Sequence, residues 1–178
     1  MKMNGKLISK PMHPGMSTHQ PTVISKQGKV VDPIDLAHEE RQVLQKYSEK
    51  ELGGSEIVAV TRSFKELRME SMSGKTIVWD AAAAKKSSCI VAVCKSPNNV
   101  YFGAIESFLT CTYKNNMVAK FAVVKAYTSS HKAQIDSGLW YAFNRRVNKK
   151  VVLFDSLSAP KITASDEEDP AKLWIINC

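Results

Sequence analysis

The feature that most constrains this chain is the series of short apolar segments that follows Gly54. These segments are rich in Val, Ile, Phe, Tyr, Trp and Thr, the residue types that favour β-strands. Turn-forming pairs such as Asn98-Asn99 and Asn115-Asn116 separate them, and helical patterns do not alternate with them. The expected strands are Glu56–Val60, Glu66–Ser71, Thr76–Trp79, Cys89–Cys94, Val100–Thr112, Val118–Tyr127, Leu139–Phe143, Lys150–Phe154 and Leu173–Ile176. The pattern predicts a mainly β fold, a small antiparallel barrel or sandwich.

One helix is expected before these strands, from about residue 33 to residue 52. Asp32 is a suitable capping residue, and Pro33 suits the first helical position. The apolar residues that share one face at helical spacing are Leu36, Val43, Leu44 and Tyr47. The pair Gly53-Gly54 ends the pattern. We expect this helix to pack on the sheet as a lid.

Residues 1–31 form a basic segment without acidic residues. They contain five lysines and three of the seven prolines, with too few apolar residues to offset the entropy of ordering. We therefore expect a basic disordered arm over residues 1–31, followed by one β-rich domain over residues 32–178. The whole chain has a net charge of +8, of which the arm supplies five charges, so the domain carries only +3.

We expect neither a secretory signal nor a membrane partner. The N-terminus has lysines but no apolar core of the kind that signal peptides contain. No apolar run approaches the roughly 20 residues that a membrane-spanning helix needs. The four cysteines form no Cys-x-x-Cys pair. Free thiols in an intracellular compartment, nuclear or cytoplasmic, are therefore expected.

Two local motifs come close to a ligand site without meeting its requirements. Ser71–Thr76 resembles the end of a phosphate-binding loop, but Met69 stands where that loop needs a glycine. Cys89 and Cys94 lie five positions apart on one expected strand, which directs their side chains to opposite faces. We therefore expect a hairpin turn at the first motif, and no metal and no cofactor.

Acidic residues that occur together are found in the expected helix and in the run from Asp166 to Asp169. We expect this run to be a solvated loop, where carboxylates stay ionised and make poor general acids. The chain also lacks the Gly-x-Ser-x-Gly turn that presents a nucleophile. No catalytic residue is predicted, and an enzyme is not expected.

The densest basic cluster is the segment from Arg145 to Lys150, with four charges in six residues. It follows the aromatic segment Trp140–Phe143, and cations beside aromatic rings suit nucleic acid. A hairpin loop with solvated charges is the alternative interpretation, because alternation along a strand leaves at most one face to a ligand. The residues predicted to bind nucleic acid are Arg145, Arg146, Lys149, Lys150, Trp140, Lys85 and Lys86.

Four further segments carry a resemblance to known proteins. They are VYFGAIESF at residues 100–108, FAVV at 121–124, VVLFDSLSAPKITA at 151–164 and LWIINC at 173–178. Together they resemble a β-rich segment near the C-termini of large uncharacterised invertebrate proteins, some of which are similar to transposon-derived proteins. The resemblance covers roughly residues 45–178. It implies a detached accessory module that once accompanied a DNA-mobilising enzyme, and it supplies no functional residues.

These observations favour binding over catalysis. The leading hypothesis is a non-catalytic binding module for nucleic acid or chromatin, because of the basic arm and the basic cluster. The alternative is a protein-interaction module that binds a peptide along an exposed edge strand. A small hydrolase assembled from dispersed residues is the third and least favoured hypothesis.

Overall fold

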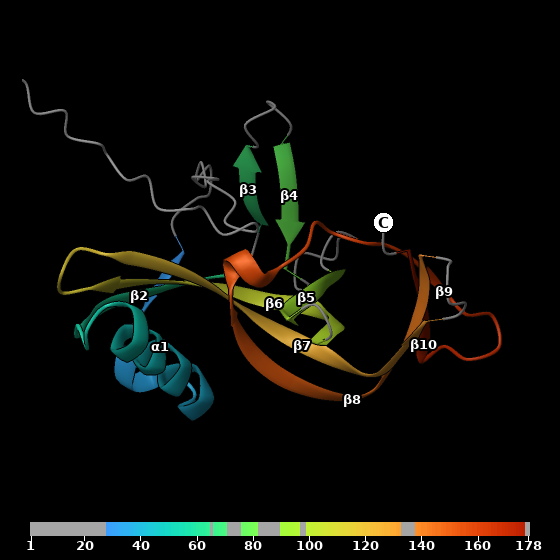
Figure 1. Cartoon of the computed structure of the whole chain (residues 1–178), viewed down its shortest axis with the longest axis horizontal. Coiled ribbons are helices and arrows are strands. Elements are labelled where there is room, and N and C mark those ends of the chain that lie inside the picture. The colour runs from blue at the N-terminus through green and yellow to red at the C-terminus, as the bar shows by residue number, and fades with distance from the viewer. Residues whose placement is uncertain are drawn as a thin grey trace, which may run out of the picture.

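The computed structural model describes residues 28–64, 66–70, 76–81, 90–96, 99–132 and 138–176. Its main feature is a curved antiparallel sheet of eight strands (Figure 1). The strand order is β1-β2-β6-β7-β8-β10-β9, and β5 pairs with the first half of β6. The strands of this sheet are β1 (Lys29–Val31), β2 (Ile57–Ser63), β5 (Ile90–Ser96), β6 (Asn99–Tyr113), β7 (Val118–Lys132), β8 (Leu139–Leu153), β9 (Ile162–Ser165) and β10 (Lys172–Ile176).

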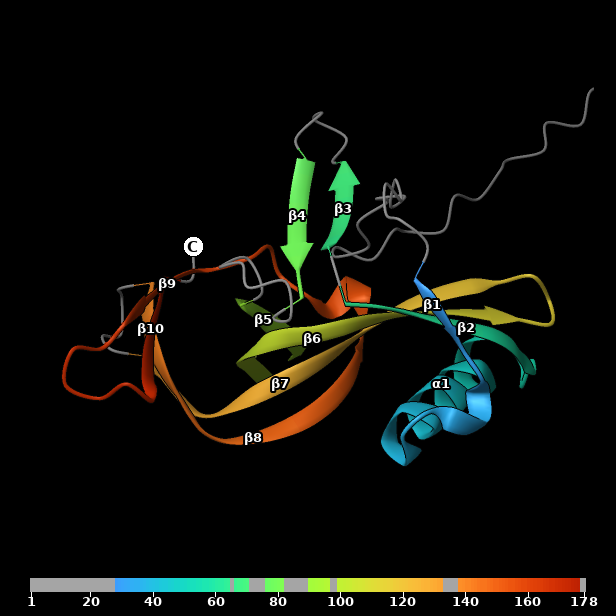
Figure 2. The ribbon, with the colours of Figure 1, turned by 180° about the vertical axis from the view of Figure 1, so that it is seen from behind.

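A separate hairpin of β3 (Glu66–Glu70) and β4 (Thr76–Asp80) stands on one face of this sheet (Figure 2). The prediction of a mainly β, antiparallel fold with one N-terminal helix is confirmed. Within the described residues the strands form a sheet that curls but does not close into a barrel by strand pairing.

The helix α1 (His38–Glu51) is shorter than predicted. Asp32 caps a separate 3₁₀ helix at Pro33–Asp35, where its carboxylate accepts the Ile34 N–H at 2.9 Å. Leu36 then has extended backbone angles, so the chain bends before α1 begins. The helix ends as predicted, because Gly53 and Gly54 have φ angles of 65° and 82° that favour glycine.

The predicted arm over residues 1–31 extends too far. Lys29–Val31 form β1, which pairs with Val60–Arg62 of β2. A strand of three residues carries almost no periodic signal, so its pairing depends on the neighbouring β2. Residues 1–27 lie outside the described part of the chain.

The largest difference concerns β8, which the sequence pattern divides into two strands around a basic hairpin loop. The structure has one strand of 15 residues instead, and Arg145 to Lys150 lie within it. The register with β7 shifts between Ala126 and Thr128, so β8 accommodates extra residues opposite this point. Basic residues are tolerated here because, among the described residues, no strand lies beside the other edge of this half of β8.

Apolar side chains pack on both faces of the sheet. On one face Leu67 and Trp79 of the β3–β4 hairpin cover Ile105 and Phe108 of the sheet. On the other face α1 covers a second cluster through Leu44, a fully buried residue. A third cluster lies where the sheet curls; it contains Ala92, Phe102, Ala142 and Ile175.

The segment that follows β8 covers the outer edge of β5. A 3₁₀ helix at Phe154–Ser156 turns the chain away from the sheet. The Ser158 N–H then donates to the Ala92 carbonyl at 2.9 Å, and the Lys161 N–H donates to the Ile90 carbonyl at 2.8 Å. These hydrogen bonds cover the outer edge of β5, so its carbonyls at Ala92 and Ile90 are not open to another strand.

Candidate protein-binding edge

The second half of β8 has a free edge. Along one side, β8 pairs with β7 within residues 140–143 and over residues 148–153, and residues 144–147 lie in the irregular stretch between them. Along the other side, β10 pairs only with residues 139–143. In the described part of the chain no strand lies beside the edge of residues 144–153. Figures 1 and 2 both show this half of β8 as the outer rim of the sheet.

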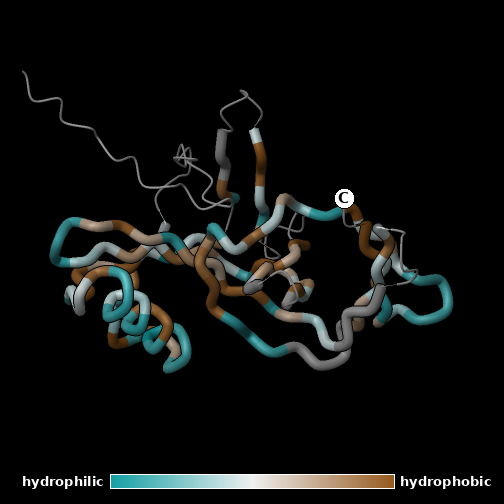
Figure 3. Tube along the Cα trace, viewed as in Figure 1, coloured by the Kyte–Doolittle hydropathy of each residue, from teal (hydrophilic) through white to brown (hydrophobic). Residues whose placement is uncertain are grey.

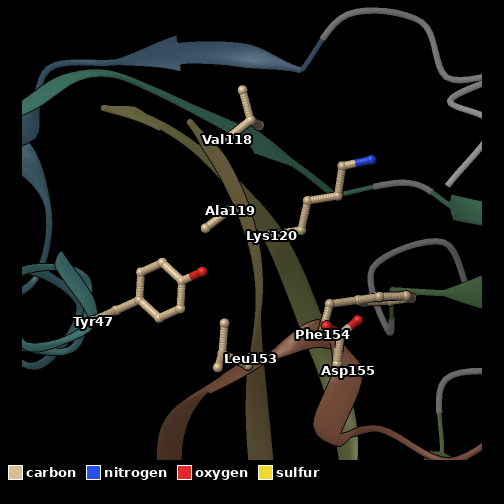
Figure 4. Close-up of a pocket in the computed structure, with 7 residues that line it drawn as sticks. All are labelled: Tyr47, Val118, Ala119, Lys120, Leu153, Phe154 and Asp155. Atoms are coloured by element: carbon tan, nitrogen blue, oxygen red, sulfur yellow. The ribbon is translucent and has the colours of Figure 1, made fainter. Parts of the chain in front are cut away.

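A notch opens where β8 ends. Leu153 pairs with Phe121, and the chain then leaves the sheet. In the described part of the chain, no strand therefore pairs with the first residues of β7, Val118 to Lys120, on the β8 side. The notch has a volume of about 360 Å³ (Figure 4) and is lined by Tyr47, Val118, Ala119, Lys120, Leu153, Phe154 and Asp155.

A second groove continues from the notch between α1 and β8. Its volume is about 280 Å³. It shares Tyr47 and Leu153 with the notch, so the two cavities are adjacent. Its remaining lining residues are Val43, Lys46, Lys50, Glu51, Phe121, Val151, Val152 and Ser156. We call the free edge of residues 144–153, the notch and the groove together the β8 edge site.

Tyr47 is the side chain that joins the two cavities. Its ring meets Phe121 edge-on at 5.4 Å between centroids, which fixes its orientation on the sheet. The hydroxyl points into the notch toward the strand that carries Ala119 (Figure 4). Burial, with the nearby carboxylates of Glu51 and Asp155, raises the pKa of this hydroxyl, so it stays protonated and able to donate.

Lys120 supplies a cation at the far side of the notch. Its ammonium group points away from Tyr47 (Figure 4). Burial lowers the pKa of Lys120. Among the described side chains, no carboxylate lies within 4.0 Å of it. An incoming group can therefore use this ammonium without displacing an ion pair.

The predicted basic cluster is divided between two faces of β8. Val151 and Leu153 pack on the α1 side, and Val152 packs on the hairpin side. By alternation Lys149 lies on the α1 side and Lys150 on the hairpin side. The Lys149 Nζ is 3.0 Å from Glu106 Oε1, and the Lys150 Nζ is 4.2 Å from the centre of the Tyr101 ring. Figure 3 shows the change from hydrophilic to hydrophobic residues along this half of β8.

No contact is described between Lys149 or Lys150 and the other residues that were predicted to bind nucleic acid. Trp140 points into the curled part of the sheet, where it packs on Phe102 at 5.4 Å. Arg145 and Arg146 lie on β8 by their backbone, and their side chains are outside the described part. Lys85 and Lys86 also lie outside the described residues.

An aromatic surface on β8 and β10 is covered by a lysine of the chain itself. Tyr141 and Trp174 are register partners with ring centroids 5.6 Å apart. The Lys172 ammonium lies 4.1 Å from the centre of the Trp174 ring and 5.3 Å from that of Tyr141. This cation occupies the position that a stacked base would need, so the surface is no open stacking platform.

The acidic run was predicted to be a solvated loop, and the structure corrects this for Asp166. Its Oδ1 accepts the N–H groups of Glu168 and Asp169 at 3.1 and 3.0 Å. Its Oδ2 accepts the Trp174 indole N–H at 2.8 Å and lies 3.1 Å from the Lys172 ammonium. The Asp169 amide, then Lys172 and Trp174, lower the pKa of Asp166 to about 2. The run is a turn organised around one carboxylate.

The β8 edge site offers hydrogen-bonding groups beside apolar cavities. An exposed strand edge presents alternating backbone donors and acceptors, and the adjacent cavities offer apolar walls with a hydroxyl and cations. Among the described residues no three His, Cys, Asp or Glu side chains lie close enough to hold a metal ion, and no helix has the length and apolarity to cross a membrane. Comparisons with protein-family models, curated proteins and solved structures find no match.

Sequence reasoning missed Tyr47, Leu153 and the start of β7 as site residues. Tyr47 reads as a core residue because it follows the apolar spacing of the helix. The notch depends on where β8 ends relative to β7. That offset is a property of register, which no local pattern in the sequence reveals.

Proposed function

We propose that this protein is a binding module that accepts an extended segment of a partner protein as an added strand on the β8 edge site. The observation that carries this proposal is the free edge of residues 144–153 beside an open groove. A sheet edge gives affinity through backbone hydrogen bonds, and adjacent pockets give specificity through alternate side chains. Both elements are present at one place on this molecule.

The groove supports a partner with alternating side chains. Residues of an added strand on the α1 side would face the cavity lined by Val43, Tyr47 and Val151. Those on the hairpin side would face Lys150. One end of the added strand would reach the notch, where the backbone of Val118 to Lys120 offers a separate edge, one strand nearer the middle of the sheet than the edge of β8.

The charge of the edge favours a foreign segment over a second copy of the chain. Residues 144–153 contain four basic residues and no acidic one. An antiparallel pair of two such edges would place like charges across from each other, which is destabilising. Lysines on a free edge are a common protection against self-pairing.

A peptide-display selection with the full chain tests the proposal. Peptides of about ten residues match a strand of this length. Selected peptides are then titrated into labelled protein, and amide resonances are followed by NMR. We expect shifts and slower hydrogen exchange at residues 148–153. Ser156→Trp, which fills the groove, should abolish binding, whereas the control Ser165→Trp on exposed β9 should not. Peptides that leave these amides unchanged, or that bind Ser156→Trp normally, would refute the proposal.

Nucleic-acid binding is a second candidate function, and the composition of residues 1–31 favours it. Five lysines without an acidic residue would give salt-dependent, sequence-tolerant affinity. A gel-shift titration across a salt series tests this. Replacing Lys2, Lys6, Lys10 and Lys26 by Gln should weaken binding, and Lys149→Gln with Lys150→Gln should leave it unchanged. If the full chain binds neither DNA nor RNA at low salt, this candidate is wrong.

A further inference from the structure

The positive charge on each side of the β8 edge site is incompletely neutralised. On the α1 side, Lys149 and Lys125 share one carboxylate, with Nζ to Glu106 Oε1 distances of 3.0 and 3.9 Å. On the hairpin side, Lys150 lies over the Tyr101 ring, and no described carboxylate is within 4.0 Å of it. Among the described side chains at the edge, each face therefore carries about one uncompensated cation.

If a partner strand pairs with β8, Lys149 and Lys150 determine which side chains are favoured at two positions of that partner strand. Side chains directly opposite each other on paired strands lie about 4.5–5.5 Å apart at Cβ, on the same face. Lys149 and Lys150 are consecutive, so two consecutive partner residues lie opposite them, one on each face. Two acidic residues at these positions would neutralise both cations.

The apolar half of the edge adds a third position. Val151 is next along β8 and packs on the α1 side with Val43 and Tyr47. The partner residue opposite Val151 therefore faces the groove of about 280 Å³. An aliphatic or aromatic side chain fits this lining, which contains Val43, Tyr47, Phe121 and Val151.

Strand direction fixes the order of the three residues. Every pair in this sheet is antiparallel, and an antiparallel partner runs opposite to β8. Its residues then meet Val151, Lys150 and Lys149 in that order from N- to C-terminus. We infer that the partner segment carries an apolar residue followed directly by two acidic residues. This inference rests on the proposed function and specifies its ligand.

Four synthetic peptides with the same flanking Thr and Val residues test the inference with the full chain. Their central residues are Leu-Glu-Glu, Leu-Gln-Gln, Leu-Lys-Lys and the reversed Glu-Glu-Leu. Affinity is measured by fluorescence anisotropy, and the site is mapped by NMR. We expect Leu-Glu-Glu to bind about tenfold tighter than Leu-Gln-Gln at low salt, and the difference to shrink at high salt. Leu-Lys-Lys and Glu-Glu-Leu should bind more weakly than Leu-Glu-Glu.

A charge-reversal pair provides the matched control. The variant Lys149→Glu with Lys150→Glu should prefer Leu-Lys-Lys over Leu-Glu-Glu. The variant Lys29→Glu with Lys114→Glu, which changes the net charge equally at exposed positions elsewhere, should keep the original preference. Peptides that map to residues 148–153 with no preference for acidic residues, or with a preference for the reversed order, would overturn this inference alone. Failure of all four peptides to perturb these amides would count against the proposed function itself.

Discussion

The guanidinium group of Arg62 holds the Glu40 carboxylate in a two-pronged contact, with Nη1–Oε1 and Nη2–Oε2 distances of 2.9 and 2.6 Å. The same guanidinium donates to the Ser107 hydroxyl at 3.1 Å, and Glu40 is only 7% exposed. The second oxygen of Glu40 also accepts the Ala37 N–H at 3.1 Å, at the start of α1. One ion pair therefore joins the helix start to β2 and β6.

We predict that Arg62→Met destabilises the protein by about 3–5 kcal/mol, because it leaves the Glu40 carboxylate buried without its cation. The free energy of unfolding is measured by urea titration. Glu39→Gln, on the exposed side of α1, is the control and should change stability by less than about 0.5 kcal/mol. Equal stability of Arg62→Met and wild type would show that the pair does not hold α1 in place.

Because the pKa of Asp166 is lowered, we predict that the folded protein loses stability in acid. Hydrogen bonds from the Asp169 amide, Lys172 and Trp174 lower its folded pKa from 3.8 to about 2. Because the folded pKa is below the unfolded one, the stabilisation is fully present above pH ~4 and is lost as the pH falls toward ~2. Asp166→Asn should be less stable at neutral pH and show a flatter stability profile between these values. Urea midpoints at several pH values measure this, with Glu167→Gln as the control. Parallel profiles for wild type and Asp166→Asn would contradict it.

The elements that the sequence predicts are those with strong local signals. The turn at Lys114–Asn116 forms as expected, with Asn116 at a φ of 63° and the Asn115 side chain accepting the Met117 N–H. The end of α1 follows from Gly53-Gly54. In both cases the decisive interaction lies within a few residues, so the local sequence contains it.

The elements that it does not predict depend on distant pairing. Residues 144–150 of β8 lack apolar alternation, because only residues 148–150 of this range pair with β7, and in the described part of the chain no strand lies beside the other edge. Strand β9 has a mostly exposed pattern and exists because it pairs with β10. The β8 edge site combines both difficulties, since it consists of an unpaired edge and of the offset between the ends of β7 and β8. The sequence identifies the basic residues of this edge, but its strand pattern leaves residues 144–149 between two expected strands.

At Gly103, strand β6 has no space for a side chain. A Cβ atom built on this residue would lie 2.6 Å from the Lys125 carbonyl oxygen and 2.6 Å from Val124 Cγ1 on β7. Backbone cannot move aside without breaking the β6–β7 register at Gly103 and Ala126. Gly103→Ala should destabilise the fold by roughly 1–3 kcal/mol through overpacking. Thermal unfolding measures it against Ser165→Ala on β9. An unchanged unfolding midpoint would contradict this prediction, because it would mean that β6 and β7 accommodate the added methyl group without loss of stability.

We predict that Lys149 and Lys150 keep copies of the chain from associating through the β8 edge. Both lie on the unpaired half of β8, and an antiparallel copy of this edge would bring like charges together. Replacing both by Thr removes two of the four positive charges of residues 144–153 and raises β propensity, so this variant should form dimers or larger assemblies at concentrations where the wild type does not.

Sedimentation velocity over a concentration series measures this association. Two controls separate edge pairing from a general loss of solubility. Lys149→Arg with Lys150→Arg keeps the positive charge of the edge and should behave as the wild type. Lys29→Thr with Lys114→Thr removes the same charge from exposed positions elsewhere and should also remain unassociated. Association of the Arg variant, or of the distant Thr variant to the same extent, would show that repulsion along β8 does not keep copies apart. If only the β8 Thr variant associates, the lysines protect an edge that is otherwise ready to pair, and the added strand must bring the opposite charge.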